Sequence, residues 1–242
     1  MGLFDNINKT AVTGKPAIVI LLALLAILTG IIVVNRLSPP SVWQLAFICD
    51  GVECRPTAVP DGSEGKIFIE EKIDLTGDGI PETVKLDQSR LFIFQNGAEI
   101  WSSNPGWQVV DAALGDPNND GRNDILVALW KPDQESVLTS HPFIVGYRGG
   151  RFKTIWGGSA VTYGIHELLL ADVDGNGIQE LVILESAYPG DGPEASLYTL
   201  SVWDWHGWGF ILRWRSEPGY YRNLGFVPDP EGGGTVTLED TR

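Results

Sequence analysis

The segment DLTGDGIPE at residues 74–82 recurs in altered form as DPNNDGRND at residues 116–124 and DVDGNGIQE at residues 172–180. We call these loops 1, 2 and 3. In each loop, positions 1 and 9 are acidic, position 6 is Gly, and positions 3 and 5 carry side-chain oxygens. Oxygens at alternate positions of a tight loop converge on one point, and the glycine allows the positive φ that turns the chain around it. The pattern predicts sites for a hard cation.

Calcium suits such loops because it takes about six to eight oxygen ligands in flexible geometry, whereas magnesium requires a stricter octahedron. Three carboxylates gathered in each loop would repel one another without a cation. We expect side chains at positions 1, 3, 5 and 9 and the backbone carbonyl at position 7 to bind calcium. The predicted ligands are Asp74, Thr76, Asp78, Ile80, Glu82, Asp116, Asn118, Asp120, Arg122, Asp124, Asp172, Asp174, Asn176, Ile178 and Glu180.

The loop pattern has two other interpretations. An EF-hand needs a Glu at position 12, where this chain has Lys85, Val127 and Ile183, so EF-hands are excluded. Asp, Asn and Gly also form ordinary turns, which explains one such loop but poorly explains three matching copies. Loops 1 and 3 are the better candidates, since the positive charge of Arg122 partly neutralises loop 2.

The surroundings of the loops also repeat. The loops begin 42 and 56 residues apart, near the period of a propeller blade. After each loop comes a short β-prone run, at 83–86, 125–130 and 181–184, and then a hairpin-like pair of runs around a glycine turn, at 92–101, 145–156 and 202–214. The repeat predicts an all-β domain.

A decayed fourth copy surrounds Asp229 and Glu231 but lacks its hairpin, while residues 46–54 have the hairpin form at the other end of the domain. We predict that the N-terminal hairpin and the C-terminal strands share one blade. The expected fold is propeller-like with about four blades, a closure that leaves no long strand edge exposed. An open stack of three units and a ring built from several chains are the alternatives.

The three loop segments, each between apolar strands, resemble the FG-GAP or VCBS-type repeats of integrin α-chains and bacterial propellers. The resemblance covers about residues 67–240. It implies a calcium-stabilised β-propeller used in adhesion, recognition or scaffolding. Such propellers often have more blades, and no clear Phe-Gly…Gly-Ala-Pro signature precedes the loops here.

Residues 17–34, AIVILLALLAILTGIIVV, carry no charge and are long enough to cross a bilayer as a helix. We predict a transmembrane helix at 17–35, a cytoplasmic segment at 1–16, a linker at 36–43 and an extracytoplasmic domain at 44–242. Lys9 and Lys15 on one flank against Arg36 on the other favour the cytoplasmic N-terminus. The alternatives are a signal peptide or a buried core helix.

Cys49 and Cys54 flank an Asp50-Gly51 turn and are predicted to form a disulfide, which suits an oxidising compartment. Two free buried thiols, or half of a zinc site, are the alternatives. Zinc is disfavoured because the chain has no second cysteine pair and only three histidines.

Composition and motifs disfavour two classes of function, nucleic-acid binding and catalysis. Seventeen Lys and Arg against 31 Asp and Glu give a net charge of -14, which disfavours nucleic-acid binding. The histidines His141, His166 and His206 accompany no catalytic motif, so we expect structural or surface histidines and no enzyme.

Four tryptophans and one insert complete the candidates. Trp203, Trp205, Trp208 and Trp214 are predicted to pack within a blade, with a sugar-binding platform as the alternative. The insert 187–196 is a candidate contact surface or a plain solvated loop. The resulting expectation is a single-pass membrane protein whose external domain binds another protein. An accessory subunit of a membrane complex and a glycan-binding or glycan-active protein are the alternatives.

Overall fold

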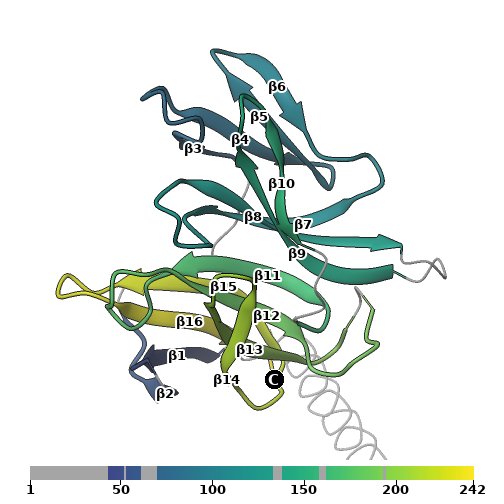
Figure 1. Ribbon diagram of the computed structural model, residues 1–242. Helices are drawn as coiled ribbons and strands as arrows, with labels where there is room; N and C mark the ends of the chain where they lie inside the picture. The colour runs from purple at the N-terminus through teal and green to yellow at the C-terminus, as the bar shows by residue number, and fades with distance from the viewer. Residues whose placement is uncertain (1–42, 52, 61–69, 133–137, 158–161, 193–194) are drawn as a thin grey trace, which may run out of the picture. The chain divides into compact units, whose positions relative to one another are not determined.

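The computed structural model describes residues 43–51, 53–60, 70–132, 138–157, 162–192 and 195–242, which fall in one compact unit, Val42–Arg242. Regular secondary structure in these ranges is entirely β (Figure 1). None of the described segments is a helix with the length and apolarity needed to cross a membrane. The predicted transmembrane helix at 17–35 and the segment at 1–16 lie outside the described residues, as does the linker apart from residue 43.

The strands form four antiparallel sheets of four strands each, which confirms the all-β prediction and the predicted number of sheets. The first sheet contains β3 (Glu70–Ile73), β4 (Glu82–Asp87), β5 (Arg90–Gln95) and β6 (Ala98–Ser102). The second contains β7 (Gln108–Gly115), β8 (Asp124–Pro132), β9 (Leu138–Tyr147) and β10 (Phe152–Gly157). The third contains β11 (Ile165–Ala171), β12 (Glu180–Ser186), β13 (Tyr198–Trp205) and β14 (Phe210–Arg215).

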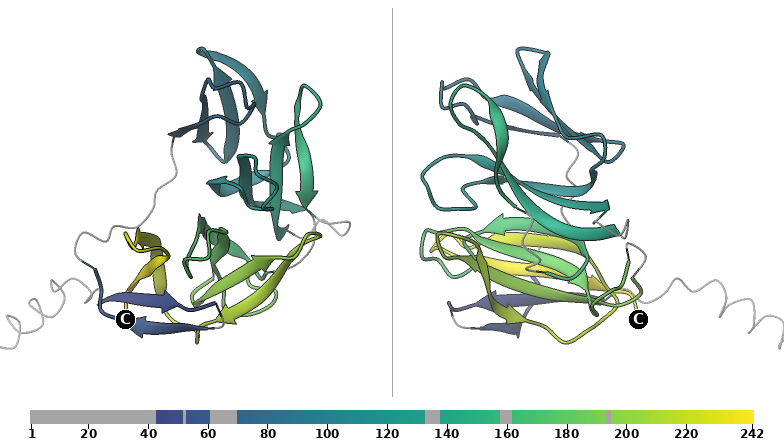
Figure 2. Two further views of the ribbon diagram at one scale, coloured as in Figure 1. Left: turned by 60° about the vertical axis from the view of Figure 1, so that its left-hand side comes forward. Right: turned by 45° about the vertical axis from the view of Figure 1, so that its right-hand side comes forward.

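The fourth sheet combines both ends of the described chain. Its order is β15 (Tyr221–Pro228), β16 (Gly234–Asp240), β1 (Trp43–Cys49) and β2 (Cys54–Thr57). Strands β1 and β16 are antiparallel, with Phe47 opposite Val236. Figure 2 shows the purple N-terminal strands beside the yellow C-terminal ones. The predicted sharing of one sheet by the N-terminal hairpin and the C-terminal strands is therefore confirmed.

Tight turns set the hairpins in the first and second sheets. Asn96 and Gly97, between β5 and β6, have φ values of 52° and 80°, and Gly149 and Gly150, after β9, have values of 66° and 82°. Two successive residues with positive φ form the turn whose twist matches that of the flanking strands. Both hairpins were predicted at these dipeptides, and both are confirmed.

The core lies between neighbouring sheets. Strand β8 is buried along most of its length, and its residues alternate between two hydrophobic clusters. Ile125 packs toward the first sheet, and Leu126 packs toward the third. In β12, Leu181 and Val182 alternate in the same way between the second and fourth sheets. A strand with both faces covered needs a continuous apolar run, which both sequences supply.

The first strands of the four sheets meet at a cavity of about 240 Å³. Each of the four sheets contributes at least one lining residue. The lining residues are Glu71, Ala113, Leu114, Leu169, Leu170 and Phe226. Because each loop follows the first strand of its sheet, this arrangement places the three acidic loops on the same side of the domain, at the left in Figure 1.

Candidate metal centre

Loops 1, 2 and 3 share one backbone conformation. Each joins the first strand of its sheet to the second, and positions 4 and 6 have positive φ in all three. Glycine occupies five of these six positions, and Asn takes the remaining one, since Asn also adopts this conformation. The φ values are 78° at Gly77, 83° at Gly79, 51° at Asn119, 79° at Gly121, 78° at Gly175 and 85° at Gly177.

The Asp at position 1 organises each loop. In loop 1, Asp74 Oδ1 accepts a hydrogen bond from the Gly77 amide at 2.7 Å, and Oδ2 accepts one from the Gly79 amide at 2.8 Å. Asp116 and Asp172 accept amide hydrogen bonds from positions 4 to 6 of their loops at 2.7 to 3.0 Å. The position-1 carboxylates therefore hold the turns closed as well as carrying charge.

The position-5 side chains also bond within their loops. The Oδ1 atoms of Asp78, Asp120 and Asn176 accept from the amide at position 7, at 2.8, 3.1 and 2.7 Å. At position 7, the side chains of Ile80 and Ile178 are exposed. At position 3, Thr76 Oγ1 donates to Glu82 Oε1 at 3.2 Å, and Asn118 Nδ2 lies 3.4 Å from Asp120 Oδ2.

The acid at position 9 is buried in every loop. Glu82 and Asp124 are 0% exposed and Glu180 is 2% exposed. In loops 1 and 3 this carboxylate accepts the amide of position 2, with distances of 2.8 Å from Leu75 and 2.9 Å from Val173. Burial raises the pKa of Asp124 to about 6 and that of Glu180 to about 7, because a charged carboxylate loses hydration there.

Loop 2 lacks the amide contact at position 2 because Pro117 has no N–H. Its acid is instead held by Arg148, the residue that follows β9. Arg148 Nη1 donates to Asp124 Oδ1 at 3.0 Å, and Nη2 donates to Asp124 Oδ2 at 2.8 Å and to Asp120 Oδ2 at 2.6 Å. We expected Arg122 to neutralise loop 2, but the guanidinium bonded to these two carboxylates is that of Arg148. Arg122 is exposed.

In loop 1, a neutral side chain makes the corresponding contacts. Gln95, at the end of β5, donates from Nε2 to Glu82 Oε1 at 2.8 Å and to Asp78 Oδ2 at 3.1 Å. Like Arg148, it bridges the acids at positions 5 and 9. Unlike Arg148, it adds no positive charge to its loop.

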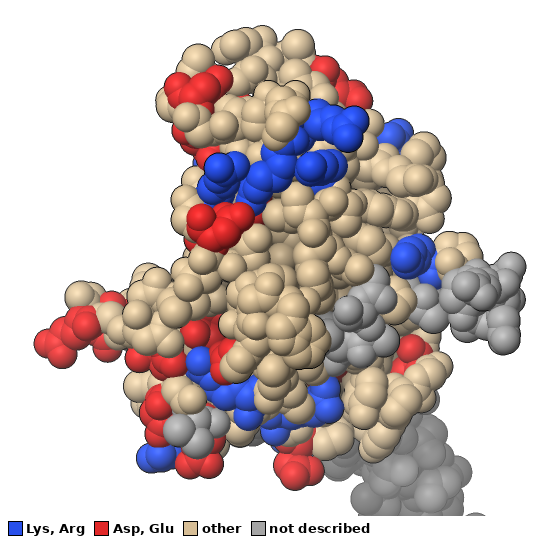
Figure 3. All heavy atoms as spheres, viewed as in Figure 1, with Lys and Arg blue, Asp and Glu red and all other residues tan. Residues whose placement is uncertain are grey.

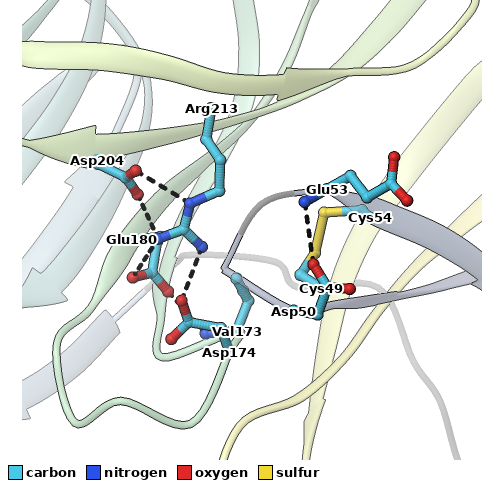
Figure 4. Close-up of a disulfide and its surroundings, with 9 residues drawn as sticks. All are labelled: Cys49, Asp50, Glu53, Cys54, Val173, Asp174, Glu180, Asp204 and Arg213. Atoms are coloured by element: carbon cyan, nitrogen blue, oxygen red, sulfur yellow. Dashed lines mark hydrogen bonds and ion pairs between the residues drawn. A yellow bond between two sulfur atoms is a disulfide. The ribbon is translucent and has the colours of Figure 1, made fainter.

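Loop 3 contacts Arg213 of β14. Its guanidinium lies 3.1 Å from Asp174 Oδ2 and 3.3 Å from Glu180 Oε1, but only 2.6 Å from Asp204 Oδ1 of β13 (Figure 4). Asp204 is a fourth carboxylate at this site, so a single arginine faces more negative charge here than Arg148 does in loop 2. The negative charge of loop 3 is therefore only partly balanced.

The closest gathering of predicted ligands is in loop 3. One carboxylate oxygen from each of Asp172, Asp174 and Glu180 lies within 4.8 Å of the other two. No other trio of described acidic, His or Cys side chains comes together in this way. Hard carboxylate oxygens at this spacing fit a divalent cation such as calcium. Several groups of acidic side chains lie along the left edge of Figure 3, the side of the acidic loops.

Position 8 links one loop to the next. Asn123 of loop 2 donates from Nδ2 to the Asp74 carbonyl of loop 1 at 3.0 Å, and Gln179 of loop 3 accepts from the Asp116 amide of loop 2 at 2.8 Å. Our sequence interpretation missed these contacts. The recurrence of an amide side chain at position 8 in loops 2 and 3 was the available signal.

Cys49 and Cys54 form a disulfide, as predicted, which excludes the free-thiol and zinc alternatives. The pair joins β1 to β2 and is buried in the core between the third and fourth sheets. The turn that it closes lies against loop 3, since a Cβ added to Gly51 would be 3.1 Å from Asp174 Oδ2. Figure 4 shows the disulfide beside the Arg213 cluster.

The aromatic candidates are largely packed. Trp203 is 5% exposed, and Trp205 packs edge-on against Trp156 in a cluster with Phe210, which confirms packing for these two tryptophans. The ring centroid of Trp214 lies 5.5 Å from that of Phe47. Trp208, at the β13–β14 turn, is 74% exposed, so the predicted packing is wrong for this residue.

Among the histidines, His166 has a clear structural setting. Its Nε2 lies 3.0 Å from Ser186 Oγ, and its ring packs edge-on against Tyr198 at 4.7 Å. Burial lowers the pKa of His166 to about 4. A neutral imidazole packed in this way fits the structural role that we expected.

Comparison with known proteins gives no family assignment: no protein-family model matches the sequence, and no curated protein matches it. The resemblance to FG-GAP and VCBS-type repeats therefore rests on the loop segments themselves.

Proposed function

We propose that residues 44–242 form a calcium-binding, propeller-like domain, held outside the cell by a transmembrane helix at 17–35, that acts as a protein-binding scaffold. The observation that carries the proposal is the line of three loops with one backbone conformation, joined to one another through position 8. Such a row is a fixed surface with a strong negative charge, and rigid loops on a scaffold are common binding elements.

The propeller-like arrangement is supported by the order in which the sheets pack. Successive sheets share hydrophobic clusters, and the first strand of each lines the same cavity. The fourth sheet takes strands from both ends of the described chain, so that the two ends of the domain are joined in one sheet. Each sheet is then a blade, and the acidic loops lie on one face of the blades.

Calcium is supported by the donor sets of loops 1 and 3. The trio in loop 3 supplies carboxylate oxygens within 4.8 Å of one another, and in loop 1 the neutral Gln95 bridges Asp78 and Glu82. A bound calcium ion supplies positive charge that offsets the repulsion among these carboxylates and so stabilises the folded state. The position-1 carboxylates keep the three loops in their shared conformation by accepting hydrogen bonds from backbone amides of the same loop.

The external location is supported by the disulfide, because such bonds persist in oxidising compartments. A protein partner is supported by the acidic loop face and by a net charge that disfavours nucleic acids. No catalytic arrangement contributes to the proposal.

Calcium binding is tested by thermal unfolding of the purified protein in chelator and in excess calcium. Saturation at about 100 times the dissociation constant adds about 2.7 kcal/mol for each site, which raises Tm by roughly 5–10 °C in a domain of this size. Asp74→Asn and Asp172→Asn should each reduce the calcium-dependent rise, and Glu231→Gln in the fourth turn should leave it unchanged. An equal calcium-dependent rise in Tm in the unchanged protein and in all three variants would refute the assignment of calcium to the loops.

The scaffold role is tested with the full-length protein purified from its native membrane after chemical cross-linking. We expect one companion protein in fixed stoichiometry, with its recovery reduced by chelator and by Asp74→Asn. Recovery of no companion, with or without calcium, would contradict the proposed role while leaving calcium binding intact.

A further inference from the structure

Three different residues stand beside the position-9 acids of the three loops. Each follows the last residue of the third strand that pairs with the second strand: Gln95 follows Phe94, Gly146 follows Val145, and Asp204 follows Trp203. At this equivalent position, loop 1 therefore has a neutral amide, loop 2 has no side chain, and loop 3 has an additional carboxylate. This difference sets the charge of each loop.

The glycine in loop 2 makes room for Arg148. A Cβ added to Gly146 would lie 2.2 Å from Asp124 Oδ1 and 3.0 Å from Arg148 Nη1, closer than packed atoms allow. Any larger residue would displace the acid or the guanidinium. Because Gly146 has no side chain, Arg148 can extend across β9 to the carboxylates of loop 2.

The guanidinium occupies the charge centre of loop 2. It bonds both oxygens of the fully buried Asp124 and one oxygen of Asp120, at 2.6 to 3.0 Å. The Arg148 side chain is only 18% exposed. A divalent cation bound to the same carboxylates would lie close to this fixed positive charge, and the repulsion would weaken its binding strongly.

We propose that Arg148 is the permanent cation of loop 2, so that loop 2 binds no calcium, and that the residue bridging positions 5 and 9 decides whether a loop requires the ion. This inference rests on the proposed calcium binding of loops 1 and 3. Gln95 leaves loop 1 dependent on calcium. In loop 3, Arg213 contacts Asp174 and Glu180 but is shared with Asp204. One guanidinium is thus set against four carboxylates, and negative charge is left for an ion.

The test exchanges the two bridging residues. Arg148→Gln gives loop 2 the bridge of loop 1, and Gln95→Arg gives loop 1 a bridge of the kind in loop 2. Arg151→Gln is the matched control, because Arg151 is exposed in the same β9–β10 turn and its loss changes the net charge equally. Calcium bound per chain is measured by equilibrium dialysis, and Tm is measured in chelator and in calcium.

We expect Arg148→Gln to bind one more calcium ion per chain than the unchanged protein, and Gln95→Arg to bind one fewer. Arg148→Gln should also have the lowest Tm in chelator and the largest rise in Tm when calcium is added. If the unchanged protein binds calcium but neither exchange alters the number of ions, the role of Arg148 is refuted and the proposed function stands.

If the unchanged protein binds no calcium and Arg148→Gln binds none, both proposals fail. If Arg148→Gln does not fold even in calcium, Gln95→Arg alone decides, and an unchanged number of bound ions in that variant refutes the inference. A gain of one ion in Arg151→Gln as well would also refute it, since net charge would then explain the effect.

Discussion

Phe47→Ala tests whether the N-terminal hairpin is part of the core. Phe47 lies in β1, opposite Val236 of β16, and its ring is 5.5 Å from that of Trp214 in the third sheet. It is 8% exposed and belongs to the cluster between the third and fourth sheets. Truncation removes a buried ring where strands from both ends of the domain meet.

Removing a buried phenylalanine side chain costs about 3–5 kcal/mol, from lost burial and the cavity left behind. We expect about 3 kcal/mol here, because a small part of the ring surface reaches solvent. In a domain of this size that loss lowers Tm by roughly 6–12 °C. Urea unfolding at fixed calcium concentration measures the change in free energy directly.

Ile48→Ala is the matched control. Ile48 is the next residue of the same strand and is 49% exposed, so its truncation should cost less than about 1 kcal/mol. Equal losses for the two variants would refute the packing of the hairpin against the third sheet. A loss below about 1 kcal/mol for Phe47→Ala would refute it as well.

Two further predictions concern the disulfide and the buried histidine. Replacing both Cys49 and Cys54 by Ala should lower the free energy of unfolding by about 2 kcal/mol, the chain-entropy value for so short a closed loop, and an unchanged urea midpoint would contradict this. The pKa of His166 is about 4 in the folded protein and 6.5 ordinarily, so the unfolded chain binds the proton first as pH falls. The contribution of His166 to the free energy of unfolding should be complete above pH 6.5 and should be lost between about pH 6.5 and 4, by roughly 1–2 kcal/mol after allowance for the partly exposed ring. His166→Gln should flatten urea midpoints measured across this range, and an unaltered pH profile would rule out His166 as the source.

Local signals predicted much of the fold. The turns at Asn96-Gly97 and Gly149-Gly150 depend on residues that adopt positive φ, and that preference is visible in the dipeptides themselves. The fourth sheet was predictable for a different reason. The fourth repeat lacks its hairpin at the C-terminal end of the domain, and an unassigned hairpin lies at the N-terminal end. Pairing the two completes one sheet, and the pairing of β1 with β16 confirms this arrangement.

The charge balance of the loops was not predictable in the same way. Arg122 lies inside loop 2 in sequence, yet the guanidinium on the buried acid comes from Arg148, 24 residues beyond Asp124. The register of β9 against β8 and the absence of a side chain at Gly146 determine that contact. Both depend on tertiary structure, and a single sequence does not display them.

The composite fourth sheet also has a consequence for synthesis. Residues 43–48, among the first of this unit to leave the ribosome, pair with residues 235–240, among the last. The three other sheets are each complete within one continuous stretch of chain. The nascent N-terminal hairpin must therefore wait, without its main neighbour, until nearly the whole unit has been translated, and pairing over so long a sequence separation is intrinsically slow. A prematurely terminated chain would release that hairpin unpaired, as an edge open to aggregation.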